Sequence, residues 1–311
     1  MNPVPGSGVS AVIVTYGRER VLVETVRRVL EQDPPPSELL IVDQTFLHAP
    51  DVERELEDLT AAGAIDWIRL PRPSIPAAMN VGLRRARSEI VLFLDDDVVP
   101  GAGLIAAHRE AHRRSGAAVV AGQVLQPGEE PVPGTPAPFR FNAADRSWVT
   151  EAIGANFSIR RDLALRIGGI DENFVRAAYG YEAELCARAI AVGARVLFEP
   201  AATVRHLRAP VGGTRSYGSH LRTILPGHSV GAFYRILRTS PRAAAPVKIV
   251  GRLARSVRTR HHLRRPWWIP VTLIAETLGL CWAIGLATRG PRLLPVSTAE
   301  VRDEVTSETV S

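Results

Sequence analysis

The chain has 311 residues, of which 46% are hydrophobic and 23% charged, and its formal net charge is +6. This composition is ordinary for a globular protein with one main domain and an appendage. Cys186 and Cys281 lie far apart in the sequence, which excludes a disulfide framework and a cysteine-based metal cluster. The first eight residues contain no apolar run, so no signal peptide is predicted.

Short apolar strands alternate with helical patterns along the first hundred residues. Strands are predicted at residues 9–15, 38–43, 65–70 and 89–94, and helices at residues 19–31, 51–61 and 77–87. This alternation predicts an α/β fold with a mainly parallel, Rossmann-like sheet, right-handed crossovers and helices on both faces. No Gly-x-Gly-x-x-Gly follows the first strand and no Gly-x-x-x-x-Gly-Lys occurs, which argues against dinucleotide redox chemistry and P-loop hydrolysis.

The fourth predicted strand ends on three consecutive carboxylates, Asp95, Asp96 and Asp97. Adjacent carboxylates repel one another, and a divalent cation such as Mg²⁺ or Mn²⁺ is the counter-charge that hard oxygen ligands favour. Because alternate residues of an extended chain point the same way, Asp95 and Asp97 are predicted to share one ion. A solvated acidic loop is the alternative. The carboxyl end of a buried strand, where open α/β sheets bind ligands, favours the metal site.

Eight short segments carry a family resemblance in consistent order. They are Val-Thr-Tyr-Gly-Arg (14–18), Ile-Val-Asp (41–43), Asn-Val-Gly (80–82), Leu-Asp-Asp-Asp (94–97), Gly-Ala-Asn-Phe-Ser-Ile-Arg-Arg (154–161), Gly-Gly-Ile-Asp-Glu-Asn-Phe (168–174), Gly-Tyr-Glu-Ala-Glu-Leu-Cys-Ala-Arg (180–188) and Val-Arg-His (204–206). Together they resemble the signatures of the family 2 glycosyltransferases, nucleotide-sugar-dependent enzymes with the GT-A fold.

The resemblance implies roles for individual residues. Asp95 and Asp97 match the Asp-x-Asp motif that holds a divalent metal on the nucleotide-sugar diphosphate, and His206 matches a further metal ligand. Asp96 matches a position that also contacts the ribose. The nucleotide-sugar-binding residues that the resemblance implies are Thr15, Tyr16, Asp43, Asn80, Asp95 and Asp96.

The catalytic base implied by the resemblance is Glu182, at the start of a predicted helix over residues 182–192. A carboxylate is wanted there because the acceptor hydroxyl loses its proton as it attacks. Glu184 lies two residues on and remains an alternative base. The sequence departs from the family pattern at three positions, Gly17, Gln44 and Tyr181.

Basic residues are concentrated in one segment of the chain. Residues 1–199 contain 21 Arg and 27 acidic residues, whereas residues 200–275 contain 14 Lys and Arg and no Asp or Glu. No nucleic-acid-binding motif accompanies these charges, so nucleic acid is not the expected partner. An anionic membrane surface is favoured, because each basic residue near such a surface adds about 1 kcal/mol of attraction.

The apolar stretch at residues 267–288 follows the basic segment. It begins with Trp-Trp after two arginines and ends before Arg289, and such flanks are typical of a membrane edge. Glu276 near its middle would cost roughly 3 kcal/mol at the centre of a bilayer. A helix lying in the membrane interface is therefore favoured, with a helix packed on the catalytic domain and a full membrane span as alternatives.

The sequence thus predicts an N-terminal tail (1–8), a GT-A catalytic domain (9–210), a basic helical C-terminal region (211–297) and a disordered tail (298–311). The expected activity is inverting transfer, with Mn²⁺ or Mg²⁺, from a UDP-, GDP- or dTDP-sugar to a hydroxyl of a glycan or lipid-linked acceptor of the cell envelope. The expected location is the cytoplasmic face of the membrane, and a homodimer remains open. The alternatives are a sugar nucleotidyltransferase and a non-catalytic protein that binds sugar nucleotides or the membrane surface.

Overall fold

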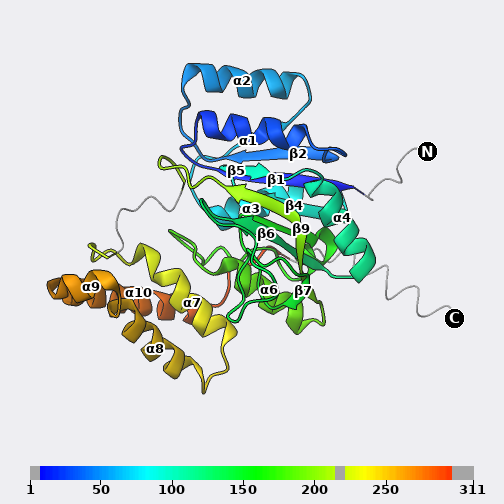
Figure 1. Ribbon diagram of the computed structural model, residues 1–311. Coiled ribbons are helices and arrows are strands. Elements are labelled where there is room, and N and C mark those ends of the chain that lie inside the picture. The colour runs from blue at the N-terminus through cyan, green and yellow to red at the C-terminus, as the bar shows by residue number, and fades with distance from the viewer. Residues whose placement is uncertain (1–7, 214–220, 296–311) are drawn as a thin grey trace.

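The computed structural model describes residues 8–213 and 221–295. Within these residues nine strands form one sheet (Figure 1), in the order β3-β2-β1-β4-β8-β6-β9-β5 with β7 beside β9. The strands are β1 (Val9–Thr15), β2 (Glu38–Asp43), β3 (Asp66–Arg69), β4 (Ile90–Leu94), β5 (Val98–Pro100), β6 (Val119–Leu125), β7 (Ser147–Val149), β8 (Asn156–Arg160) and β9 (Val196–His206). The predicted N-terminal and C-terminal tails lie almost wholly outside the described residues.

The helices predicted at residues 19–31, 51–61, 77–87, 182–192 and 267–288 are present with bounds that differ by about two residues at most, and the structure adds five others. The described helices are α1 (Arg20–Leu30), α2 (Pro50–Ala61), α3 (Ile75–Arg85), α4 (Leu104–Ser115), α5 (Arg161–Arg166), α6 (Tyr181–Ala191), α7 (Val230–Thr239), α8 (Ala245–Val257), α9 (Arg260–Arg264) and α10 (Ile269–Thr288). Strands β3, β2, β1 and β4 pair in parallel, and β6 pairs in parallel with β9, whereas β8 runs antiparallel to both β4 and β6. The predicted mainly parallel α/β fold is confirmed.

Side chains alternate between the two faces of the sheet, and helices cover both. Ile13 faces a core built with α1, α2 and α4, whereas its neighbour Val12 faces a larger core built with α3, α6, α7 and α10. Figure 1 shows α1 and α2 above the sheet and α6 and α7 below it. Because both faces are buried, strand β4 is an unbroken apolar run, and carboxylates follow directly after its end.

Strand β9 is longer than the sequence predicts. The sequence has a short β-like pattern at residues 195–198 followed by Pro-Ala-Ala, which predicts a turn, whereas the structure has one strand that continues to His206. Its pairing with β6 shifts register, from Gly122 opposite Glu199 to Gln123 opposite Thr203. This irregularity absorbs the expected turn, and the end of β9 then pairs antiparallel with β5 so that His206 lies opposite Val98.

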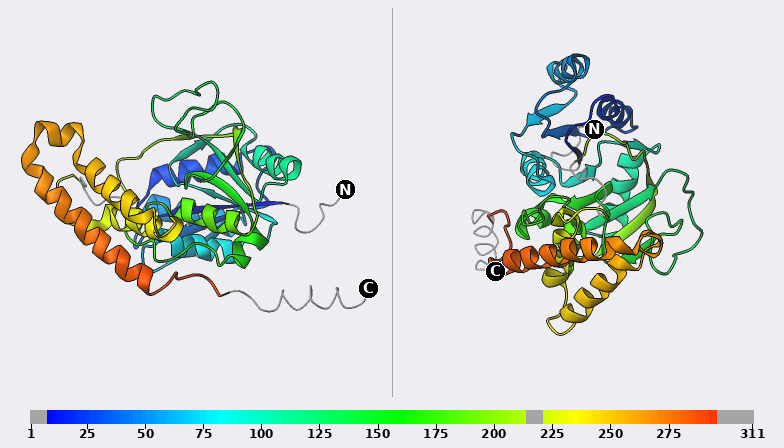
Figure 2. Two further views of the ribbon diagram at one scale, coloured as in Figure 1. Left: turned by 90° about the horizontal axis from the view of Figure 1, so that it is seen from below. Right: turned by 90° about the vertical axis from the view of Figure 1, so that its left-hand side faces the viewer.

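The C-terminal helices extend from one side of the sheet (Figure 2). Phe233 and Tyr234 of α7 and Leu286 of α10 belong to the same core as the sheet residues. Residues 266–288, which contain α10, are long and apolar enough to cross a membrane by length and composition, a property that core helices share. One stripe of α10 is buried, and Leu278 on another side is 47% exposed.

Candidate active site

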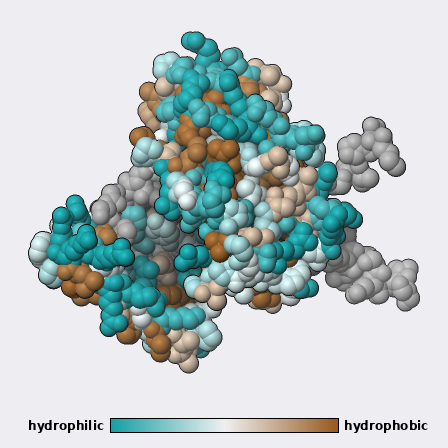
Figure 3. All heavy atoms as spheres, in the orientation of Figure 1, coloured by the Kyte–Doolittle hydropathy of each residue, from teal (hydrophilic) through white to brown (hydrophobic). Residues whose placement is uncertain are grey.

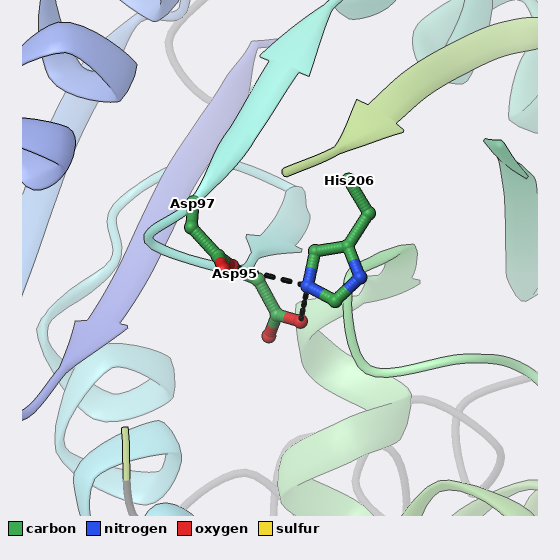
Figure 4. A group of neighbouring side chains, drawn as sticks. All are labelled: Asp95, Asp97 and His206. Atoms are coloured by element: carbon green, nitrogen blue, oxygen red, sulfur yellow. Dashed lines mark hydrogen bonds and ion pairs between the residues drawn. The ribbon is translucent and has the colours of Figure 1, made fainter. Parts of the chain in front are cut away.

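Asp95, Asp97 and His206 form a cluster at the carboxyl end of β4 (Figure 4). His206 Nε2 lies 3.1 Å from Asp97 Oδ1 and 3.6 Å from Asp95 Oδ2. The β5–β9 pairing positions the ring, since β5 begins one residue after Asp97 and Val98 pairs with His206. The main chain reinforces the contact, because Leu207 N donates to Asp97 O at 2.8 Å and Ala209 N to Asp97 Oδ2 at 2.8 Å.

The charges of this cluster shift its titration. Burial alone would lower the pKa of His206, but its hydrogen bond to Asp97 and the charges of Asp97 and Asp95 outweigh burial and raise that pKa. Burial would raise the pKa of the Asp97 carboxyl, but its contacts with His206, Ala209 and Arg18 outweigh burial and lower that pKa. The cluster therefore attracts positive charge, which an imidazolium or a bound cation supplies.

The donor set of the cluster fits a divalent metal. Two carboxylates and one imidazole offer ligand atoms that all lie within 4.8 Å of one another. Carboxylates suit both Mg²⁺ and Mn²⁺, whereas an imidazole ligand favours the transition metal of the two. Asp97 is 1% exposed and Asp95 is partly exposed, so the site is anchored on one side and open on the other.

Arg18 is a central residue of the site that sequence reasoning missed. Its Nε lies 3.0 Å from Asp96 Oδ1 and its Nη2 lies 3.1 Å from Asp97 Oδ2, and the residue is 8% exposed. Its Nη1 also donates to the carbonyls of Ala209 and Val211. Its position in the sequence could have indicated this role, because Arg18 follows β1 closely. The carboxyl end of β1 adjoins that of β4 in the sheet. This arginine holds two of the three aspartates and the chain after β9 together.

Asp96 faces away from the metal cluster, toward Arg18 and Thr15. Burial raises the pKa of Asp96 to about 7, and the charges of Asp95 and Asp97 add to that rise, while Arg18 and the Thr15 hydroxyl oppose it. The predicted division of the triad, with Asp95 and Asp97 together and Asp96 apart, agrees with these contacts. Its physical basis differs, because β4 ends at Leu94 and the three carboxylates lie in a turn.

A cavity of about 290 Å³ adjoins the cluster. Its lining combines the three aspartates and His206 with Thr15, Tyr16, Gln44, Gly154 and Tyr181. Gly17 beside Tyr16 has φ +63°, a backbone conformation that glycine and asparagine adopt most readily. The family that the sequence resembles usually has asparagine at this position, and asparagine tolerates the same conformation. The other two departures, Gln44 and Tyr181, both lie on the cavity wall.

Asp43 and Asn80 are engaged in contacts inside the protein. The Asp43 carboxylate lies 2.6 Å from His48 Nε2 and accepts hydrogen bonds from Trp67 Nε1 at 3.0 Å and Thr45 N at 2.8 Å. Asn80 donates to Ile170 O and accepts from Ile170 N, both at 2.8 Å. Neither residue is among those that line the cavity, so their predicted roles in nucleotide-sugar binding stay predictions.

The two candidate bases lie in different environments. Glu182 Oε1 accepts a hydrogen bond of 3.1 Å from Gly154 N, and Gly154 forms part of the cavity wall. Both carboxylate oxygens of Glu184 lie 2.9 Å from Arg188 Nε, and Arg238 Nη2 lies 3.6 Å away. Glu184 would have to break these ion pairs to accept a proton. Glu182 is not itself among the residues that line the cavity, but its contact with Gly154 in the cavity wall favours it over Glu184.

A comparison with known sequences decides the family. A sequence model described as Glycosyl transferase family 2 matches residues 10–168, just over half of the chain. The chain belongs to this family. The match includes the Asp95–Asp97 triad and stops before Glu182 and His206, whose contacts come from the structure. A curated relative of this family 2 glycosyltransferase is the glucosyl-dolichyl phosphate glucuronosyltransferase of Haloferax volcanii, 27% identical over 219 residues, with coverage of 64% of this chain and 68% of the relative.

Solved structures show the same fold as this family 2 protein at low sequence identity. GalNAc-T7, solved with UDP, GalNAc and Mn²⁺, has a TM-score of 0.56 at 16% identity over 80% of this chain and 54% of its own. The mannosyltransferase PcManGT of Pyrobaculum calidifontis, solved with GDP-Man and Mn²⁺, has a TM-score of 0.54 at 17% identity over 93% of this chain and 82% of its own. The chain therefore spans about half the length of GalNAc-T7 and most of PcManGT.

Proposed function

We propose that this family 2 glycosyltransferase transfers a sugar from a nucleoside-diphosphate sugar to a hydroxyl group, with inversion at the anomeric carbon and with Mn²⁺ as its metal. The observation that carries the proposal is one cavity that joins the Asp95–Asp97–His206 cluster to the wall held by Glu182. Mn²⁺ is favoured over Mg²⁺ because His206 adds a nitrogen ligand to two carboxylates.

Each part of the cavity has a chemical task in this reaction. A metal bound to Asp95, Asp97 and His206 would neutralise the charge that develops on the departing diphosphate. Arg18 keeps Asp96 and Asp97 in place through its contacts at 3.0 and 3.1 Å. Glu182 accepts the proton of the attacking hydroxyl, and a single displacement assisted by one base inverts the anomeric configuration.

The substrates follow from the residues around the cluster and from the relatives. Tyr16, 36% exposed on the cavity wall, offers a ring face for stacking of the donor base. UDP, GDP and dTDP all present such a base. The curated relative is named for a lipid-linked acceptor, glucosyl-dolichyl phosphate. A glycan or lipid-linked hydroxyl acceptor, of the kind used in cell-envelope polysaccharides, is proposed for this chain.

Donor hydrolysis tests the proposed reaction without knowledge of the acceptor. With UDP-, GDP- and dTDP-sugars and Mn²⁺, slow release of a nucleoside diphosphate is expected for one donor class, and Asp97→Asn should abolish it. A sugar nucleotidyltransferase would instead release pyrophosphate from a nucleoside triphosphate. A non-catalytic protein would bind the nucleotide sugar and release nothing, and either result would reject the proposal.

We also propose that the C-terminal helices place the enzyme on the cytoplasmic face of an anionic membrane. Apolar patches lie among hydrophilic residues over these helices, at the lower left of Figure 3. Ile274 and Leu278 of α10 are 49% and 47% exposed, and Val247 of α8 is 74% exposed. Glu276, the acidic residue within α10, turns inward and lies 2.9 Å from Arg252 Nε. The exposed side of α10 can therefore enter the interface without placing that carboxylate in lipid.

Co-sedimentation with liposomes tests the membrane proposal. Binding should be stronger to anionic than to neutral vesicles, and Ile274→Ser with Leu278→Ser should weaken it on both. Val192→Ser is the matched control, because Val192 is 62% exposed next to α6 of the catalytic domain. Binding that is unchanged by the α10 substitutions, or changed equally by Val192→Ser, would reject this role of α10.

A further inference from the structure

A second cavity, of about 480 Å³, lies among α7, α8 and α10. Three arginines line it, Arg235 from α7 and Arg252 and Arg255 from α8, together with one acidic residue, Glu276 from α10. The cavity therefore carries a surplus of positive charge, and its three arginines belong to the segment from 200 to 275 that contains no acidic residue. The glycosyl-transfer chemistry proposed above does not use these arginines.

The three arginines differ in how much of their charge is already paired. Arg252 is bound to Glu276, with Nε–Oε2 at 2.9 Å and Nη2–Oε1 at 3.1 Å. Arg235 lies 3.3 Å from Glu151, in a pair whose side chains are 42% and 49% exposed. Such an exposed pair is weak, so Arg235 can turn to another anion. Arg255 has no acidic partner within the described parts of the chain, 8–213 and 221–295.

The second cavity shares a wall with the first. Tyr179 lines the second cavity and Tyr181, the first residue of α6, lines the first, so the short segment from Tyr179 to Tyr181 lies between them. Gly180 between them packs against Arg235, and a Cβ atom at Gly180 would lie 2.6 Å from Arg235 Cδ. Glu182 follows directly in α6. A ligand held in the second cavity would therefore lie on the side of the active site that carries the base.

The rim of the second cavity is apolar. Leu225 lines it and is 65% exposed, and Ile224 beside it is 52% exposed. The exposed face of α10 continues this surface through Ile274. An anionic group that carries a long apolar chain matches both parts, since the arginines bind the anion and the rim accepts the chain.

We propose that the second cavity binds the phosphate group of a lipid-linked acceptor, with Arg255 and Arg235 as its ligands. This inference rests on the proposed function for the position of the acceptor hydroxyl beside Glu182. Arginine recognises phosphate through two parallel N–H donors, and two guanidinium groups on neighbouring helices can both donate hydrogen bonds to one phosphate. The lipid chain then leaves over Leu225 toward the membrane, and the sugar of the acceptor extends past Tyr179 and Tyr181 toward the first cavity.

Binding of farnesyl phosphate to the full-length protein tests the proposal, measured in EDTA so that the metal cluster takes no part. Arg255→Gln should weaken the affinity about tenfold, the loss expected for one charge-assisted contact with phosphate. Arg258→Gln is the matched control, because Arg258 is also exposed, lies one turn further along the chain and is outside the cavity lining. It removes the same charge and should change the affinity less than twofold. Arg235→Gln should repeat the effect of Arg255→Gln.

Three comparisons separate the sources of phosphate. Inorganic phosphate should bind more weakly than farnesyl phosphate, and equal affinity would overturn the lipid part of the proposal. Arg255→Gln and Arg258→Gln should both bind vesicles of phosphatidylglycerol more weakly than the wild type, and by the same factor. A selective loss for Arg255→Gln with these vesicles, but not with farnesyl phosphate, would assign the cavity to bilayer lipid and overturn the acceptor role. Equal effects of the two variants on farnesyl phosphate would overturn the cavity as the site.

A separate measurement keeps this inference distinct from the proposed function. Nucleoside diphosphates with Mn²⁺ should bind all three arginine variants with wild-type affinity, because the Asp95–Asp97–His206 cluster is intact in them. Absence of nucleotide binding in the wild type would reject the proposed function while leaving the farnesyl phosphate result interpretable. Normal nucleotide binding together with unchanged farnesyl phosphate binding in Arg255→Gln would reject only the second site.

Discussion

Two buried histidines of α4 should make the enzyme sensitive to acid. His108 contacts Ser158 Oγ and Asn156 Oδ1, each at 2.8 Å, and His112 contacts the same Ser158 Oγ and Ala117 O, each at 2.8 Å. Burial lowers the pKa of His108 from 6.5 to about 4, and burial also lowers the pKa of His112 to about 3. Both rings are therefore neutral in the folded protein at pH 7.

The sign of the effect follows from the two states of each ring. Below pH 6.5 the unfolded chain takes up a proton on each histidine, while the folded protein takes up none until the pH approaches 4 and then 3. The unfolded state binds more protons in this window, so the free energy of unfolding falls as the pH is lowered. One proton contributes about 1.4 kcal/mol per pH unit, so each ring lowers stability by about 2 kcal/mol at pH 5 and the pair by about 4 kcal/mol.

Urea unfolding at pH 7, 6 and 5 measures this loss. His108→Gln and His112→Gln each remove one titrating ring, so each variant should lose about 2 kcal/mol less than the wild type between pH 6.5 and 5. The carboxylates titrate alike in wild type and variant, so the difference reports the substituted ring together with its coupling to the other histidine through Ser158. Far-UV circular dichroism at pH 7 checks that the variants keep the fold.

An equal loss in wild type and variants would refute this reasoning and would have a structural meaning. The contacts run in a chain from Asn156 Oδ1 to Ala117 O, and Asn156 Nδ2 is already donating to Gln123 O and Ala202 O. Four contacts between acceptors at both ends need four protons, whereas two neutral rings and one hydroxyl supply three. A pH-independent difference would therefore show that one ring already carries the fourth proton at pH 7.

Further outcomes test the site itself. Asp97→Asn should weaken Mn²⁺ binding by about 100-fold or more, since even residues outside the ligand set cost up to that much; unchanged calorimetric affinity would remove Asp97 from the metal site. Arg18→Gln should lower the free energy of unfolding by about 3–5 kcal/mol in EDTA, because it leaves Asp96 and Asp97 without their guanidinium. Mn²⁺ should raise the melting temperature of that variant more than that of the wild type, and an equal rise would contradict the charge argument. Glu182→Gln should reduce turnover by roughly 10²-fold with unchanged donor affinity, whereas Glu184→Gln should mainly lower stability. The reverse pattern in turnover would make Glu184 the base.

Local pattern in the sequence was sufficient for the first half of the fold. Strands β1 and β2 are mainly apolar and end on Thr15 and Asp43, and β4 is an apolar run that carboxylates follow directly. The helices between them have one apolar face, so the approximate limits of these elements follow from neighbouring residues alone. The position of Asp95 to Asp97 at the end of a buried strand follows in the same way. Strand β9 was predicted too short, because its continuation depends on pairing with β5 and on a register shift against β6.

The composition of the site depended on contacts between distant residues. His206 meets Asp97 across 109 positions and Arg18 meets Asp97 across 79, and only the order of strands in the sheet brings them together. The choice between Glu182 and Glu184 likewise rested on which carboxylate faced Gly154 and which faced Arg188.

The apolar C-terminal stretch shows the same division. Its length and its Trp-Trp start can be identified in the sequence, because hydropathy is a property of each residue. The direction in which Glu276 points is set by packing of α10 on α7 and by its ion pair with Arg252 on α8. Residue type and spacing therefore determined which elements form and which chemistry they carry. Tertiary packing decided which side chains meet, because pairing between distant segments depends on the whole sheet and its covering helices.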